Sequence, residues 1–133
     1  MRLWHIDLIT NSLLPKSQLL AQWRELNSIF KKQDNHILIN YIYKYGKEKL
    51  LGYTACLVTE LTRRGYNIKN VDNLNNYFCD TDEYSNKPIG DYPEHNRRYL
   101  LQCFYNLQEK YDRGQKDFSE ELYKKLEKFV FSS

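Results

Sequence analysis

Glycine and proline are scarce in this chain, which has five glycines and three prolines among its 133 residues. Aromatic residues make up 15% and hydrophobic residues 41% of the chain, and twelve residues are tyrosines. This balance suits a compact helical protein with polar-tipped aromatic side chains at its surface. It also argues against disorder beyond the last few residues. At this length the chain fits one domain, residues 1–133, with a single core.

Cysteine is equally scarce, and its pattern bears on the cellular compartment. The three cysteines, Cys56, Cys79 and Cys103, form no CxxC pair, and their odd number argues against a disulfide framework. The chain also lacks a signal-like apolar run and any stretch near the roughly 20 apolar residues of a membrane span. We therefore expect a soluble cytoplasmic protein without a membrane partner, and nothing in the sequence indicates an obligate protein partner.

Metal-binding and cofactor-binding motifs are missing as well. The three histidines, His5, His36 and His95, form neither an HExxH motif nor a cluster with cysteine. The sequence has no Gly-rich phosphate loop and no nucleophile elbow. We therefore predict no metal site, no cofactor and no conventional nucleophile. The formal net charge of +3 permits a polyanionic partner but is too small to imply one.

The arrangement of apolar residues predicts an all-α fold, in which an N-terminal arm (residues 1–14) packs against a bundle of about four main helices. The predicted helices span residues 15–32, residues 47–64, a segment from Asp91 or Tyr92 to 113, and a segment that starts behind Asp117 or Ser119. Residues 37–43 have strand propensity but no partner strand, so we expect a short helix or an irregular buried segment there. We expect a single helical turn at residues 74–78 and a loop at 85–91.

The helix predicted at residues 15–32 is the most informative segment. Leu19, Trp23, Leu26 and Phe30 form one apolar stripe along it. Glu25 lies one step of about 100° from Leu26, so its carboxylate can reach from the packed face towards a partly dry cleft. The alternative for Glu25 is a surface ion pair one helical turn away.

Arginines are found at the ends or flanks of the predicted helices, and this placement suggests a shared role. Arg2, Arg24, Arg64, Arg97 and Arg98 could converge into a face that binds phosphates. Alternatively, each arginine complements a helix dipole or lies on a solvated surface.

Four motifs occur in an order that resembles one known family. They are Arg2 after the first residue, Trp23-Arg24-Glu25-Leu26, Arg64-Gly65-Tyr66-Asn67-Ile68-Lys69, and Gly90-Asp91-Tyr92-Pro93-Glu94-His95. Together they span residues 1–113 and resemble the pyrimidine-dimer DNA glycosylase family. The resemblance implies an all-α protein that binds damaged duplex DNA, and a nucleophile that is the α-amine of the mature N-terminal residue.

The resemblance also implies roles for individual residues. The nucleophile would be the amine of Met1, because the bulky Arg2 side chain is expected to block removal of the initiator methionine, whereas the family normally exposes a threonine. Glu25 would be the assisting carboxylate. Arg2 and Arg24 match the phosphate contacts of the family, and Tyr92 and His95 match one of its motifs. With the arginines singled out by their placement, the predicted DNA contacts are Arg2, Arg24, Arg64, Tyr92, His95, Arg97 and Arg98. The Trp- and Tyr-rich tail known from the family has no counterpart in the chain's C-terminal residues.

The hypothesis is a DNA-repair glycosylase with abasic-site lyase activity. α-Amines titrate at about 7.7–8.0, so a useful fraction is neutral and nucleophilic near neutral pH. Two alternatives remain open at this point. One is a helical nucleic-acid-binding domain without catalysis, and the other is an interaction module whose arginines are only solvated helix ends.

Overall fold

The computed structural model describes residues 1–33, 35–81 and 92–132. Within these residues the chain forms six α-helices and one 3-10 helix, and no strand, which confirms the all-α prediction. The helices are α1 (Ile6–Thr10), α2 (Lys16–Lys31), η1 (Asn40–Lys44), α3 (Lys47–Arg63), α4 (Asp72–Tyr77), α5 (Arg97–Asp112) and α6 (Glu120–Phe131). The predicted loop at residues 85–91 and the proposed helix start at Asp91 lie outside the described residues.

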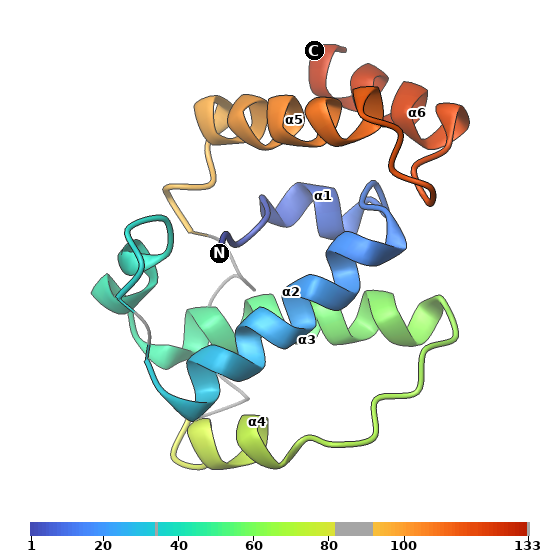
Figure 1. The fold of residues 1–133 in the computed structure, drawn as a ribbon. Coiled ribbons are helices and arrows are strands. Elements are labelled where there is room, and N and C mark those ends of the chain that lie inside the picture. The colour runs from blue at the N-terminus through green and yellow to red at the C-terminus, as the bar shows by residue number, and fades with distance from the viewer. Residues whose placement is uncertain (34, 82–91, 133) are drawn as a thin grey trace.

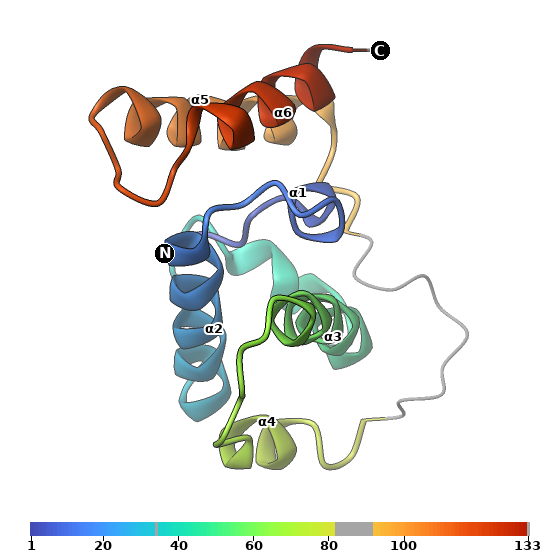
Figure 2. The same cartoon turned by 90° about the vertical axis from the view of Figure 1, so that its right-hand side faces the viewer.

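The N-terminal arm runs through the middle of the molecule. Helices α5 and α6 form one layer, α2 and α3 cross in another, and the arm with α1 lies between them (Figure 1; Figure 2). Helix α4 covers the far side of α2. The buried apolar residues of all these elements form one hydrophobic cluster, to which the arm contributes the fully buried Leu3, Leu8 and Ile9. The predicted packing of an arm against four long helices is therefore confirmed.

Helices α2 and α3 form where their apolar periodicity predicts them. In α2, Leu19, Leu26 and Phe30 are buried, and Pro15 is the residue that precedes the first turn. Helix α3 ends as predicted, because Gly65 adopts a left-handed φ of 91°. The Tyr66 N–H then donates to the Leu61 carbonyl at 3.0 Å, which closes the helix end. Helix α6 starts behind Ser119, whose hydroxyl accepts from the Leu122 N–H.

Two short segments differ from the sequence-based expectation. The arm is not irregular throughout, because Ile6–Thr10 form helix α1, with His5 accepting from the Asp7 N–H at its start. Residues 37–43 contain the 3-10 helix, but they are not uniformly buried. The Ile37 side chain is 84% exposed and Leu38 is 42% exposed, while Ile39 is fully buried.

The third long helix begins later than predicted. Pro93 and Glu94 belong to a turn, and α5 starts only at Arg97, because the Asn96 side chain accepts from the Tyr99 N–H at 3.0 Å. The turn places Tyr92 and His95 in the core, where they are 1% and 9% exposed. None of the helices in the described part of the chain is both long and apolar enough to cross a membrane.

The start of α5 can be tested with Asn96→Ala. Loss of the N-cap should lower the free energy of unfolding by about 1 kcal/mol, because the Tyr99 N–H loses its acceptor. Urea denaturation measures the change. Asn106→Ala, on the exposed face of the same helix, is the matched control and should leave stability unchanged or slightly higher. Equal stability of the Asn96 variant and the wild type would contradict the assigned helix start.

Candidate active site

The N-terminal arm is held by the side chain of one buried glutamine of α2. Gln22 is fully buried, and its Oε1 accepts from the Trp4 N–H at 2.8 Å. Its Nε2 donates to the Arg2 carbonyl at 3.0 Å. A side-chain amide carries the same donor and acceptor as a peptide group, so it satisfies both backbone groups of an arm that has no strand partner. The first residues of the chain are thereby fixed along α2.

Tyr53 of α3 supports the same contact. Its hydroxyl lies 2.6 Å from the Trp4 carbonyl oxygen and 3.1 Å from Gln22 Oε1, and both oxygens can accept from it. The ring is fully buried, and burial raises the pKa of this phenol well above its ordinary value, so it remains a donor. The arm is therefore clamped by α2 and α3 together.

Gln22 also reaches the predicted catalytic carboxylate. Its Nε2 lies 3.2 Å from Glu25 Oε2, one turn further along α2. One amide therefore contacts both the backbone of the arm that carries Met1 and the side chain of Glu25. This arrangement fixes the N-terminus relative to the carboxylate.

Glu25 is half-buried, and several positive or hydrogen-bonding groups act on its carboxylate. Burial raises the pKa of the carboxyl above its ordinary range. The positive charge of the Met1 α-ammonium, the Arg2 backbone N–H, Arg24 and His36 oppose this rise without cancelling it. The Glu25 carboxyl therefore keeps a raised pKa although it lies within the electrostatic range of the N-terminal amine.

A basic cleft lies on the outer face of α2. It has a volume of about 400 Å³ and is open to solvent. Arg24 and Lys31 line it from α2, and both are exposed. The remaining lining residues are Trp23, Asn27, Ser28, Asn70 and Asn73. Cationic and amide side chains of this kind can bind phosphate oxygens.

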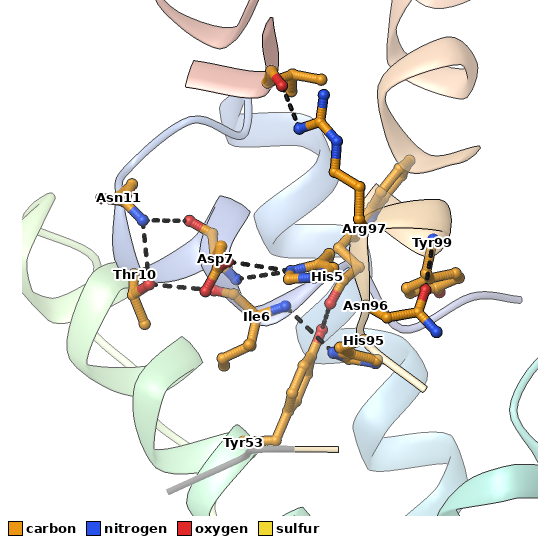
Figure 3. A network of polar contacts seen from close by, with 12 residues as sticks. His5, Ile6, Asp7, Thr10, Asn11, Tyr53, His95, Asn96, Arg97 and Tyr99 are labelled. Atoms are coloured by element: carbon orange, nitrogen blue, oxygen red, sulfur yellow. Dashed lines mark hydrogen bonds and ion pairs between the residues drawn. The ribbon is translucent and has the colours of Figure 1, made fainter. Parts of the chain in front are cut away.

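A second anchor of the arm comes from the turn before α5. His95 Nδ1 accepts from the Ile6 N–H at 3.2 Å (Figure 3). Its Nε2 lies 2.6 Å from the Tyr41 hydroxyl oxygen. Burial, followed by the neighbouring His5, lowers the pKa of His95 to about 3. The ring is therefore neutral, and since Nδ1 accepts, the proton sits on Nε2. From α5 itself, the Tyr99 hydroxyl donates to the Leu3 carbonyl.

The predicted DNA contacts do not all converge. Tyr92 and His95 are buried and face the core, which removes them from the protein surface. Arg64 is hydrogen-bonded to Glu60 at 2.9 Å at the far end of α3, and Arg97 donates to the Val130 carbonyl at the end of α6. Arg98 is exposed in the first turn of α5.

Arg2 lies next to the site, but its guanidinium is directed towards two aromatic rings. Its guanidinium carbon is 5.7 Å from the centre of the Tyr99 ring and 6.0 Å from that of Trp4. Both distances suit cation–π contacts. Of the residues predicted to function, the structure thus gathers Met1, Arg2, Arg24 and Glu25.

Three residues of the site were not predicted: Gln22, Tyr53 and His36. Gln22 had a signal in the sequence, because it occupies the apolar face of α2 between Leu19 and Leu26. A polar residue at such a position needs a buried partner. Within the described residues, no three His, Cys, Asp or Glu side chains are grouped closely enough to hold a metal ion.

A helical protein with an anchored N-terminal arm, a half-buried carboxylate and a basic cleft on one helix has features expected of a small DNA glycosylase. A profile of the pyrimidine dimer DNA glycosylase family matches residues 1–74, more than half of the chain, and the chain belongs to this family. Membership implies a DNA substrate. No curated protein and no solved structure gives a significant match. The matched region contains Met1, Gln22 and Glu25, whereas the turn before α5 lies beyond it.

The role of Gln22 can be tested with Gln22→Met. The variant should lose about 1–3 kcal/mol of folding free energy, because the Trp4 N–H and the Arg2 carbonyl lose their buried partner. It should also speed hydrogen exchange at the Trp4 amide, as followed by NMR. Gln18→Met is the matched control, because Gln18 is buried on the same helix but pairs with Gln115. It should be destabilised as well while keeping the Trp4 amide protected. Equal protection in both variants would contradict the clamp.

Proposed function

We propose that the chain is a DNA glycosylase with abasic-site lyase activity that forms a Schiff base between its Met1 α-amine and C1′ of a damaged nucleotide. The observation that supports this most directly is the anchoring of the arm that carries Met1 beside the half-buried Glu25, on whose carboxylate the Met1 ammonium acts electrostatically. The Gln22 amide that holds the arm also contacts that carboxylate. The amine is thus kept in place before DNA arrives.

The first stage of the reaction replaces the damaged base by the enzyme amine. The neutral Met1 amine attacks C1′, the glycosidic bond breaks, and the bonding electrons leave with the base. The nitrogen gives up one proton as its bond to C1′ forms, and the departing base takes one up. Positive charge develops on the sugar as the base departs, and the Glu25 carboxylate stabilises it. The sugar ring then opens as its O4′ takes up a proton, and C1′ and the amine nitrogen form the Schiff base.

The second stage cuts the strand. Glu25 removes a proton from C2′, the C3′–O bond breaks, and the 3′ phosphate leaves with the electron pair. Water then hydrolyses the Schiff base and releases the Met1 amine. The raised pKa of Glu25 makes it a stronger base than an ordinary glutamate, which suits the proton abstraction.

The exposed cationic side chains near Met1 and Glu25 are the proposed phosphate-binding groups. Arg24 and Lys31 line the cleft beside Glu25, and we assign them to the DNA backbone, whose binding releases counterions. Arg98 remains a proposed phosphate contact, since it is exposed. For Tyr92, His95, Arg64 and Arg97 we propose structural roles, because their side chains are buried or bonded within the protein.

The nucleophile can be tested by borohydride trapping. Untagged protein, mixed with a duplex that contains one abasic site and reduced with borohydride, should give a covalent adduct whose peptide map places the DNA on the Met1 nitrogen. Protein acetylated at its N-terminus is the control, and it should bind the duplex without forming an adduct. An adduct on a lysine would reject Met1. DNA binding without any adduct would favour a nucleic-acid-binding domain that lacks catalysis.

The role of Glu25 can be tested through pH dependence. Only the ionised carboxylate can accept the C2′ proton, so strand cleavage should fall as the pH drops through the pKa of Glu25. Since that pKa is raised, the loss should begin at higher pH than the ordinary value of about 4.3 would give. Glu25→Gln should cleave at least about 100-fold more slowly and lack this limb of the profile. Glu109→Gln, at an exposed residue of α5, should match the wild type. Protonation of the amine lowers the rate of both proteins at a higher pH, so Glu25 would be rejected as the base by a second limb, in the range of its own pKa, that persists in Glu25→Gln.

A further inference from the structure

Two exposed aliphatic side chains project from the turn between α2 and η1. Ile37 is 84% exposed and Leu38 is 42% exposed, whereas the next residue, Ile39, is fully buried. The turn is held by backbone hydrogen bonds, because the His36 carbonyl accepts from the N–H groups of Ile39 and Asn40 at 2.9 and 3.0 Å. The His36 ring nitrogen Nδ1 also accepts from the Leu38 N–H at 3.2 Å. The two apolar side chains are therefore presented on a well-supported turn.

This turn lies next to the candidate active site. His36, its first residue, is close enough to Glu25 to lower the pKa of that carboxyl. In Figure 1, the teal segment that contains η1 lies on the same side of the molecule as the N-terminus. A group bound at Glu25 would therefore lie within reach of the turn.

The surroundings of the turn are basic and not apolar. The residues just before the turn in the sequence line an open cleft of about 570 Å³. They are the exposed Lys31 and Lys32, with Ser28, Gln33 and Asn35. An apolar protein partner would have to cover these lysines, whereas a nucleic acid offers phosphates to them and stacked bases to the aliphatic side chains. The charge around the turn thus favours DNA as the partner.

We propose that Ile37 and Leu38 form a wedge that enters the base stack beside the lesion and opens it. Apolar side chains inserted at a base step unstack it and kink the duplex. The proposed chemistry needs such an opening, because C1′ of a stacked nucleotide is not accessible to an amine fixed on the protein surface. The inference rests on the proposed function for the position of the lesion, and it adds the residues that deform the DNA.

The wedge can be tested apart from the chemistry by base fluorescence. The probe is a duplex with a tetrahydrofuran abasic analogue, which cannot form a Schiff base, next to 2-aminopurine, which brightens when it unstacks. Saturating wild-type protein should raise the fluorescence several-fold. The double variant Ile37→Ser/Leu38→Ser should lose most of this rise, while Ile37→Leu should keep it. Tyr105→Ser, which removes a 54% exposed aromatic residue from α5, is the control and should behave as wild type.

Cleavage of authentic abasic DNA supplies the second readout. A single strand has no duplex to open, so the double variant should lower the ratio of the duplex rate to the single-strand rate at least tenfold. A fluorescence rise and a rate ratio that both remain at wild-type levels would overturn the wedge. Wild-type protein that unstacks the uncleavable duplex but cleaves neither substrate would instead reject the proposed chemistry and leave the wedge standing. Both substituted residues are exposed, and a thermal melt confirms that the double variant is folded.

Discussion

The buried amide of Gln22 is the contact on which the proposed site depends. An extended arm that enters a helical core brings backbone N–H and carbonyl groups into a dry interior, and each needs a partner there. Gln22 supplies one donor and one acceptor to the arm, and the Tyr53 hydroxyl supplies another donor. An apolar side chain at position 22 would leave these groups unpaired. The arm, the carboxylate and the crossing of α2 over α3 are therefore fixed by one polar cluster.

The C-terminal half of the chain completes this clamp, although the family profile ends at residue 74. His95 and Tyr99 bond to the arm from the opposite side, at the Ile6 N–H and the Leu3 carbonyl. Since His95 is neutral over the physiological range, its bond to Ile6 does not depend on pH there. The turn that carries the fourth motif of the family resemblance thus acts on the site from the core. The burial of His95 suits this role.

The sequence predicted the elements whose signals are local. Gly65 predicted where α3 ends, and Ser119 was one of two residues predicted to precede α6. The apolar stripe predicted α2. The start of α5 was predicted too early, because the chain buries Tyr92, turns at Pro93 and Glu94, and begins the helix only behind the Asn96 cap. Met1 and Glu25 came from a motif. The role of Gln22 was not predicted. A single polar residue on an apolar helix face does not reveal its partner when that partner is a backbone group distant in the sequence.

Helix α2 can serve both chemistry and DNA binding because of its periodicity. Gln22 and Glu25 are three residues apart, so they share the face that looks towards the arm. Arg24, Ser28 and Lys31 follow spacings of four and three and share the outer face, where they line the cleft. Arg2 acts on Glu25 through its backbone N–H, while its guanidinium lies over Tyr99 and Trp4. In the proposed mechanism the Glu25 carboxylate therefore stays basic, and the DNA phosphates bind to a different face of α2 from the proposed reacting groups.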